Sequence, residues 1–173
     1  SQGRFDKDHG YVCTLSALIL KQNRAHIFHA GDGRVYRIQA QSIEQLTIDH
    51  RVRLSSTEHY LSRALGVDHR IEVDYQQLEL CEDDLFLLMT DGVYEFIDIQ
   101  QISDMLQQKQ NLDTIAQSIV ELALKRGSDD NLTIQIIRID ALAQEKSFQI
   151  QENILFPQQL SHGDLFEGYR IHK

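Results

Sequence analysis

Three aspartates lie at the ends of segments whose apolar residues are typical of β-strands. Asp32 follows one such segment, Asp91 follows a second, and Asp130 precedes a third. If the last strand runs antiparallel to the other two, all three carboxylates reach the same end of a sheet. Carboxylates that close would repel one another, so they would take up protons or bind a cation. Three independent turn aspartates would give the same spacing, and the pattern leaves both interpretations open.

The ligand chemistry of such a site would select hard divalent ions. Carboxylate oxygens favour Mg²⁺ or Mn²⁺, whereas zinc sites use Cys and His at characteristic spacings. The two cysteines, Cys13 and Cys81, belong to no such spacing and fall within strand-like segments. We expect both to be reduced and buried rather than joined in a disulfide.

The strand expected to position Asp91 is the most apolar segment of the chain. Residues 85–89 are all apolar, and a run this short bounded by turn residues is typical of a strand buried on both faces. Thr90 and the Asp91-Gly92 pair follow directly. The carboxylate of Asp91 is therefore expected where this strand leaves the core.

The first half of the chain predicts antiparallel strands joined by short turns. Residues 11–20 carry apolar or small side chains at the odd positions, which predicts a half-buried strand with that face inward. Residues 25–30 predict its hairpin partner. Further strands are expected at 35–38, 42–47 and 71–80, and one or two helical turns at 60–65, closed by Gly66.

From Asp98 onward the apolar period changes to that of helices. Asp98 is placed to cap a first helix, and Asn111 or Asp113 a second helix that ends near Gly127. Residues 132–139 predict a final strand. Hairpins followed by two adjacent helices indicate an α+β fold with helices layered on antiparallel sheets, rather than alternating βαβ units.

Length and charge exclude several classes of protein. The 173 residues suffice for one domain with a short appendage, and no apolar run approaches the roughly 20 residues of a membrane helix. The formal charge of −9 and the scattered basic residues argue against nucleic-acid binding. We expect a cytoplasmic protein without membrane contact.

The composition becomes Gln-rich past Asp140, so we expect one domain at 1–140 and a linker region at 141–173.

Five stretches, in order, resemble motifs of the metal-dependent protein serine/threonine phosphatases of the 2C type: HAGDGRVYRI, LTIDH, LSRALG, LFLLMTDG and GSDDNLTIQII. The resemblance covers roughly residues 10–140 and implies a four-layer α-β-β-α sandwich with two antiparallel sheets. It implies that Asp91 and Asp130 are ligands of a catalytic metal pair. It also implies that Asp32 belongs to a third, weaker metal position, so that a complete domain binds two or three Mg²⁺ or Mn²⁺ ions.

The activity implied by this resemblance is hydrolysis of phosphoserine or phosphothreonine in proteins, by a hydroxide that bridges two divalent ions. No protein side chain acts as a covalent nucleophile in that reaction. The N-terminal motifs of the family, with their catalytic acid, are not found in residues 1–10. We therefore expect this stretch to be the C-terminal two-thirds of the domain and to be weakly active or inactive alone.

Two features depart from the pattern of the family. Gly33 replaces the Ser that usually follows the Asp of its motif, and only ten residues separate His50 from Leu61, where relatives carry a flap segment. A short flap would leave the site more open.

Four other residues that could do chemistry are expected to be structural. His50 lies in the LTIDH motif, and we favour a structural role over acid/base catalysis. His26 and His29 alternate faces of a strand, so they cannot chelate a metal as a local pair. Arg34 could bind phosphate, although an ion pair on the strand surface is favoured.

The end of the chain, LSHGDLFEGYRIHK, resembles the segment that leads into a bacterial protein kinase domain, with a first strand at Tyr169. A phosphatase fused to a kinase would give this order, and a disordered linker is the alternative. The alternative function is a catalytically silent regulatory or interaction domain of the same fold that docks on a kinase or a phosphoprotein. The presence of Asp91 and Asp130 favours the enzyme.

Overall fold

The computed structural model of the protein describes residues 12–40, 42–53, 59–66, 70–108, 110–143, 165–166 and 169–170. The chain divides into two compact units, Ser1–Ala143 and Gln144–Lys173. Within the second unit, β10 (Leu165–Phe166) and β11 (Tyr169–Arg170) pair as an antiparallel hairpin. The strand at Tyr169 lies where the kinase resemblance placed one, but the kinase interpretation itself stays a prediction.

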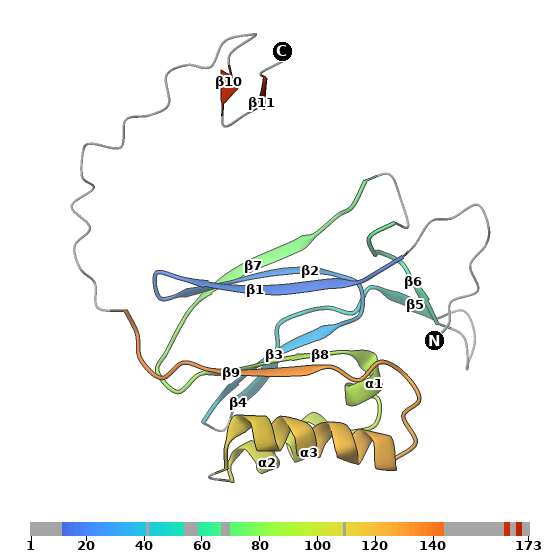
Figure 1. Cartoon of the computed structure of the whole chain (residues 1–173), viewed down its shortest axis with the longest axis vertical. Coiled ribbons are helices and arrows are strands. Elements are labelled where there is room, and N and C mark those ends of the chain that lie inside the picture. The colour runs from blue at the N-terminus through green and yellow to red at the C-terminus, as the bar shows by residue number, and fades with distance from the viewer. Residues whose placement is uncertain are drawn as a thin grey trace. The chain divides into compact units, whose positions relative to one another are not determined.

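The first sheet of the larger unit has three antiparallel strands in the order β1-β2-β7 (Figure 1). Their bounds are β1 (Leu15–Lys21), β2 (Arg24–Ala30) and β7 (Asp74–Glu79). The hairpin β1-β2 turns through Gln22 and Asn23, whose positive φ angles of 49° and 59° are those of a tight two-residue turn. The predicted hairpin is confirmed.

The inward face of β1 differs from the prediction. Leu18 packs against the core, whereas Ile19 is 50% exposed. Apolar residues occupy both odd and even positions of this strand, so alternation alone did not determine which face is buried.

The second sheet has four antiparallel strands in the order β4-β3-β8-β9. Their bounds are β3 (Arg34–Gln39), β4 (Ser42–Gln45), β8 (Leu85–Met89) and β9 (Ile134–Arg138). Phe86 and Leu87 of β8 are fully buried, and β8 lies between β3 and β9. The prediction of a strand buried on both faces is therefore confirmed.

Three helices follow or flank this sheet: α1 (Asp91–Tyr94), α2 (Ile99–Leu106) and α3 (Leu112–Lys125). The side chains of Asp98 and Asn111 accept hydrogen bonds from the first turns of α2 and α3, which confirms both predicted caps. Ile115 and Ile119 of α3 are buried in one core cluster with Leu87 of β8. The short helix α1 was not predicted.

The prediction of helical turns at 60–65 was wrong. Residues of β5 (Arg51–Arg53) and β6 (His59–Leu61) pair as a small antiparallel hairpin instead. Beyond β6, Leu65 forms an isolated antiparallel bridge with Cys13. Pairing within this short hairpin, and of Leu65 with Cys13, therefore overrides the weak local helical pattern.

The prediction that both cysteines are buried was also wrong, although both are free thiols. Cys13 precedes β1 and Cys81 lies in the turn that joins β7 to β8, and both are exposed. Strand-like composition extended past the true strand ends at both positions, where side chains are less protected.

The two sheets pack face to face, and the helices cover one side of the pair (Figure 1). Ala25 and Ile27 of β2 share a buried cluster with Val35, Phe86 and Ile139 from the second sheet and its end. Helices α2 and α3 lie on the opposite face of the second sheet. The α+β fold with two antiparallel sheets is confirmed, and the described residues supply one of the two expected helical layers. No helix in this part of the chain is long and apolar enough to span a membrane.

Candidate functional site

At one edge of the second sheet, the start of β3, the end of β8 and the start of β9 lie side by side. Met89 at the end of β8 pairs with Arg34 on one side and with Ile134 on the other. β8 runs antiparallel to β9, as the sequence interpretation assumed, whereas β2, the strand that precedes Asp32, belongs to the first sheet. Asp32 lies just before β3, Asp91 just after β8, and Asp130 shortly before β9. We call this end of the sheet the acidic edge.

The backbones that carry Asp91 and Asp130 are in direct contact. A Cβ atom at position 92 would lie 2.7 Å from the carbonyl oxygen of Asn131 and 3.4 Å from the carbonyl carbon of Asp130. Contacts that close are not tolerated between real side chains and backbone, so Gly92 is required there. We call residues 90–92 together with 128–133 the Asp91–Asp130 junction.

Hydroxyl groups lock this junction. The Thr90 hydroxyl donates to the carbonyl oxygen of Asn131 at 2.7 Å and accepts from the backbone N–H of Thr133 at 3.0 Å. The Ser128 hydroxyl, which is buried, donates to the carbonyl oxygen of Gly92 at 2.8 Å. The hydroxyls of the sequence motifs therefore satisfy backbone groups that the approach of the two loops would otherwise leave without partners.

Each of the two carboxylates is oriented by the residue that follows it. The backbone N–H of Gly92 donates to Asp91 Oδ1 at 3.0 Å, and that of Asn131 donates to Asp130 Oδ1 at 2.7 Å. Turns of this kind are the reason that Asp is favoured before Gly or Asn at such positions. At the junction each carboxylate thus accepts a hydrogen bond from the backbone N–H of the next residue.

Asp32 lies in a different environment, among charged and aromatic side chains. Nε of Arg51 is 3.3 Å from Asp32 Oδ2, and the Tyr94 hydroxyl donates to the carbonyl oxygen of Asp32 at 2.8 Å. Burial raises the pKa of Asp32, and the negative charge of Asp91 raises it further, while Arg51 opposes both effects. Asp32 and Asp91 therefore interact electrostatically across the acidic edge.

A second arginine is paired close by. Arg34 donates to both carboxylate oxygens of Asp49, at 3.0 Å from Nε and 2.8 Å from the terminal nitrogen. Its guanidinium carbon lies 3.8 Å from the centre of the Tyr94 ring. The ion pair predicted for Arg34 is confirmed. We use the name Asp32 cluster for the charged and aromatic residues around this carboxylate: Asp32, Asp49, Arg34, Arg51, Tyr94 and Glu95.

His50 fixes the backbone that leads to Asp32. Its backbone N–H donates to the carbonyl oxygen of Gly31 at 2.7 Å, and the Gly31 N–H donates to His50 Nδ1 at 3.1 Å. Nδ1 is thus an acceptor, and Nε2 donates to Asp74 at 2.8 Å. The ring is buried, and the structural role predicted for His50 is confirmed.

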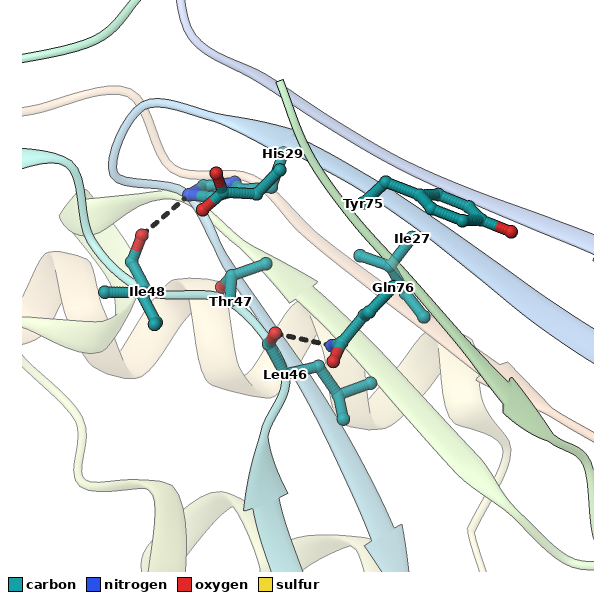
Figure 2. Close-up of a pocket in the computed structure, with 8 residues that line it drawn as sticks. Ile27, His29, Leu46, Thr47, Ile48, Tyr75 and Gln76 are labelled. Atoms are coloured by element: carbon teal, nitrogen blue, oxygen red, sulfur yellow. Dashed lines mark hydrogen bonds between the residues drawn. The ribbon is translucent and has the colours of Figure 1, made fainter. Parts of the chain in front are cut away.

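His29 lines a cavity formed by β2, β7 and the segment that follows β4 (Figure 2). The cavity measures about 230 Å³, and the three aspartates are not among its lining residues. His29 Nε2 donates to the carbonyl oxygen of Ile48 at 3.1 Å, and the Ser16 hydroxyl donates to Nδ1 at 3.0 Å. Burial lowers the pKa of His29, and the neighbouring His50 lowers it further.

His26, the other histidine of β2, contacts the Tyr75 hydroxyl instead, so the two histidines do not form a local pair, as predicted.

The residues of the acidic edge suit a hard divalent ion in their chemistry. They offer carboxylate oxygens, which Mg²⁺ and Mn²⁺ prefer, and the contact at Gly92 holds Asp91 and Asp130 on adjoining backbone. Within the described ranges, no three His, Cys, Asp or Glu side chains converge closely enough to bind a metal by themselves. Asp91 and Asp130 thus fit part of a cation site.

Sequence reasoning did not identify Arg51, Tyr94 or Glu95 as parts of the site. Arg51 donates to Glu95 at 2.7 Å and contacts the Tyr94 hydroxyl, although these residues are more than 40 positions apart. Arg51 directly follows the LTIDH motif, which is the only local signal it carries. Its partners could be recognised only once the hairpin β5-β6 was placed beside α1.

Comparison with known proteins gives a consistent result. A profile of the family described as protein phosphatase 2C matches residues 7–136. The serine/threonine phosphatase stp of Listeria welshimeri is 29% identical over 143 residues, which is 74% of this chain and 57% of that protein. The chain thus spans somewhat more than half the length of the curated relatives that it matches.

Solved structures share the fold. PppA, described as a key regulatory component of T6SS in Pseudomonas aeruginosa, superimposes with a TM-score of 0.66 at 29% identity, covering 72% of this chain and 56% of that one. The Mycobacterium tuberculosis serine/threonine phosphatase PstP/Ppp gives 0.64 at 27% identity, covering 74% and 60%.

Proposed function

This chain belongs to the protein phosphatase 2C family, and from that membership we propose that it supplies the metal-binding edge of a protein serine/threonine phosphatase. The observation that carries the proposal is the contact between Gly92 and the backbone of Asp130 and Asn131, which brings two carboxylates to one end of a rigid sheet. Independent turn aspartates would not need this contact.

In this proposal Asp91 and Asp130 bind a pair of catalytic ions, Mg²⁺ or Mn²⁺, and Asp32 borders a third position. Bound divalent ions would lower the pKa of a water nucleophile and neutralise charge on the phosphoryl oxygens. The described residues contribute by holding the carboxylates still. Thr90 and Ser128 fix the Asp91–Asp130 junction, and His50 fixes the backbone before Asp32.

We further propose that the substrates are phosphoserine and phosphothreonine residues of proteins, as the names of the relatives support, and that the protein acts in the cytoplasm. The free thiols of Cys13 and Cys81 are compatible with a reducing compartment. The tail beyond residue 143 is proposed to lead into a protein kinase domain of the same polypeptide. Support for that step is limited to the tail motif and the strand at Tyr169.

The test is Mn²⁺-dependent release of phosphate from a phosphothreonine peptide by the natural polypeptide that contains these 173 residues. We expect Asp91→Asn to lower the rate by about 100-fold, since a metal ligand supplies several kcal/mol of transition-state stabilisation. Asp129→Asn is the matched control, because Asp129 is exposed and immediately precedes Asp130 in the same loop. A wild-type protein that binds Mn²⁺ but releases no phosphate would contradict the proposal and favour the silent interaction domain.

A further inference from the structure

Arg51 places a guanidinium group against the half of the acidic edge that holds Asp32. Its Nε lies 3.3 Å from Asp32 Oδ2 and 3.9 Å from Asp49 Oδ2. The Arg51 and Asp32 side chains are only 15% and 17% exposed, so the charges are poorly screened by water. Asp32 therefore already has a cation beside it, and that cation belongs to the protein.

The contact between Arg51 and Asp32 is one of charge rather than of a formed hydrogen bond. Nε of Arg51 is buried and makes no hydrogen bond, because the N–H does not point at an acceptor. The terminal nitrogens donate to Glu95 Oε1 at 2.7 Å and to the Tyr94 hydroxyl. Arg51 is thus held by the end of α1, and its Nε makes no hydrogen bond to the Asp32 carboxylate.

A divalent ion at Asp32 would meet Arg51 directly. Two positive groups within contact distance of one carboxylate repel each other strongly where water is scarce. Glu95 is an alternative partner for the Arg51 guanidinium, because the Glu95 carboxylate already forms an ion pair with Arg51 and is 49% exposed. The same side chain can therefore neutralise Asp32 when no ion is present and withdraw toward Glu95 when an ion binds.

We propose that Arg51 is an internal counter-ion of Asp32, which a divalent ion must displace before it can bind at that carboxylate. The inference rests on the proposed function, because it assumes that the acidic edge binds divalent ions. It makes the Asp32 position weaker than the Asp91–Asp130 junction. Arg51 is also the first residue of β5. Binding of an ion at Asp32 would therefore loosen the contact between β5 and the acidic edge.

Titration of the chain with Mn²⁺ by isothermal calorimetry tests this inference. Arg51→Gln is expected to tighten the weaker class of Mn²⁺ sites by about tenfold, within the usual range of coupling between sites, and to leave the tighter class within about twofold. Arg138→Gln is the matched control, since it removes the same charge from an exposed pair with Asp140. The proposal would be overturned if Arg51→Gln left the Mn²⁺ affinity of the weaker class unchanged, or if Arg138→Gln raised that affinity by the same factor.

Two more variants locate the effect, and the second of them does not contain Arg51→Gln. Asp32→Asn combined with Arg51→Gln should abolish the gain. Glu95→Gln, a change at a half-exposed residue, should weaken the weaker class about threefold, because Arg51 then loses its alternative partner and stays at Asp32. No change in Glu95→Gln counts against the inference.

The outcomes separate the two proposals. Absence of any Mn²⁺ binding in wild type and variants would contradict the proposed metal site and the role of Arg51 together. Tight Mn²⁺ binding that depends on Asp91, with no response to Arg51 or Glu95, would contradict the role of Arg51 alone.

Discussion

The two halves of the acidic edge are built in different ways. The Asp91–Asp130 junction is held by backbone contact and by the hydroxyls of Thr90 and Ser128. The Asp32 cluster is held by long side chains, with Arg51 reaching from β5 to Asp32 and to Glu95. A site held by backbone keeps its geometry whatever is bound, whereas one held by a flexible arginine can rearrange. The comparison indicates one half that keeps its geometry and one half that can adjust.

The largest expected effect comes from closing the space at the junction. Gly92→Ala would put a methyl group 2.7 Å from the Asn131 carbonyl oxygen, so we expect a loss of about 3 kcal/mol in the free energy of unfolding and at least tenfold weaker Mn²⁺ binding. Gly33→Ala is the matched change beside Asp32. Its new Cβ would lie 3.0 Å from the Ser16 hydroxyl, which need shift only slightly, and 3.6 Å from the Met89 carbonyl oxygen, which is an ordinary contact, so we expect a cost below about 1 kcal/mol.

Urea unfolding and Mn²⁺ calorimetry on both glycine variants measure the difference. Equal losses in Gly92→Ala and Gly33→Ala would contradict the view that only the junction depends on close backbone contact.

The next effect concerns the backbone before Asp32. His50→Gln would leave the buried N–H of Gly31 without its acceptor, and we expect a loss of about 2 kcal/mol in the free energy of unfolding. His26→Gln removes a histidine whose bond to the Tyr75 hydroxyl lies at the surface, so its cost should stay within about 0.5 kcal/mol. Chemical denaturation gives both values, and a neutral His50→Gln would refute the positioning role.

A smaller effect is expected within the Asp32 cluster. Tyr94→Phe keeps the ring beside Arg34 but removes the hydroxyl that donates to the Asp32 carbonyl oxygen, for a loss of about 1 kcal/mol in the free energy of unfolding. The tighter class of Mn²⁺ sites should be unchanged. Tyr75→Phe is the control, because Tyr75 is 54% exposed and lies outside the cluster. A Tyr94→Phe protein that loses tight Mn²⁺ binding would show that the two halves are not separable.

The smallest effect is a dependence of stability on pH. The pKa of His29 is lowered in the folded protein by burial and by His50, from an ordinary value of 6.5. Below pH 6.5 His29 is largely protonated in the unfolded chain but still neutral in the folded protein. The free energy of unfolding therefore falls as the pH falls. His29→Gln should reduce this slope between about pH 7.5 and 5.5. Identical slopes in wild type and His29→Gln would exclude His29 as the source.

The junction could be predicted from sequence because its signals are local. An apolar strand followed by Thr90, Asp91 and Gly92 contains both the carboxylate and the glycine that permits the contact. The capping residues Asp98 and Asn111 are local signals of the same kind. The antiparallel order that brings Asp91 and Asp130 together was an assumption, and the pairing of β8 with β9 confirms it.

The Asp32 cluster could not be predicted, because its contacts are distant in sequence and depend on side-chain reach. Arg51 and Glu95 carry no periodic pattern that marks them as partners. The hairpin β5-β6 was mistaken for a helical turn because its strands are short and pair only with each other. The buried face of β1 was misassigned because apolar residues lie on both faces.

The central claim is that Asp91 and Asp130 bind divalent ions together. The most direct test is the Mn²⁺ affinity of Asp91→Asn, Asp130→Asn and the loop control Asp129→Asn, measured by calorimetry on folded protein. We predict that either of the first two substitutions weakens the tighter sites by about 100-fold, while Asp129→Asn leaves them within about twofold of wild type. Tight Mn²⁺ binding retained in both Asp91→Asn and Asp130→Asn would contradict the claim.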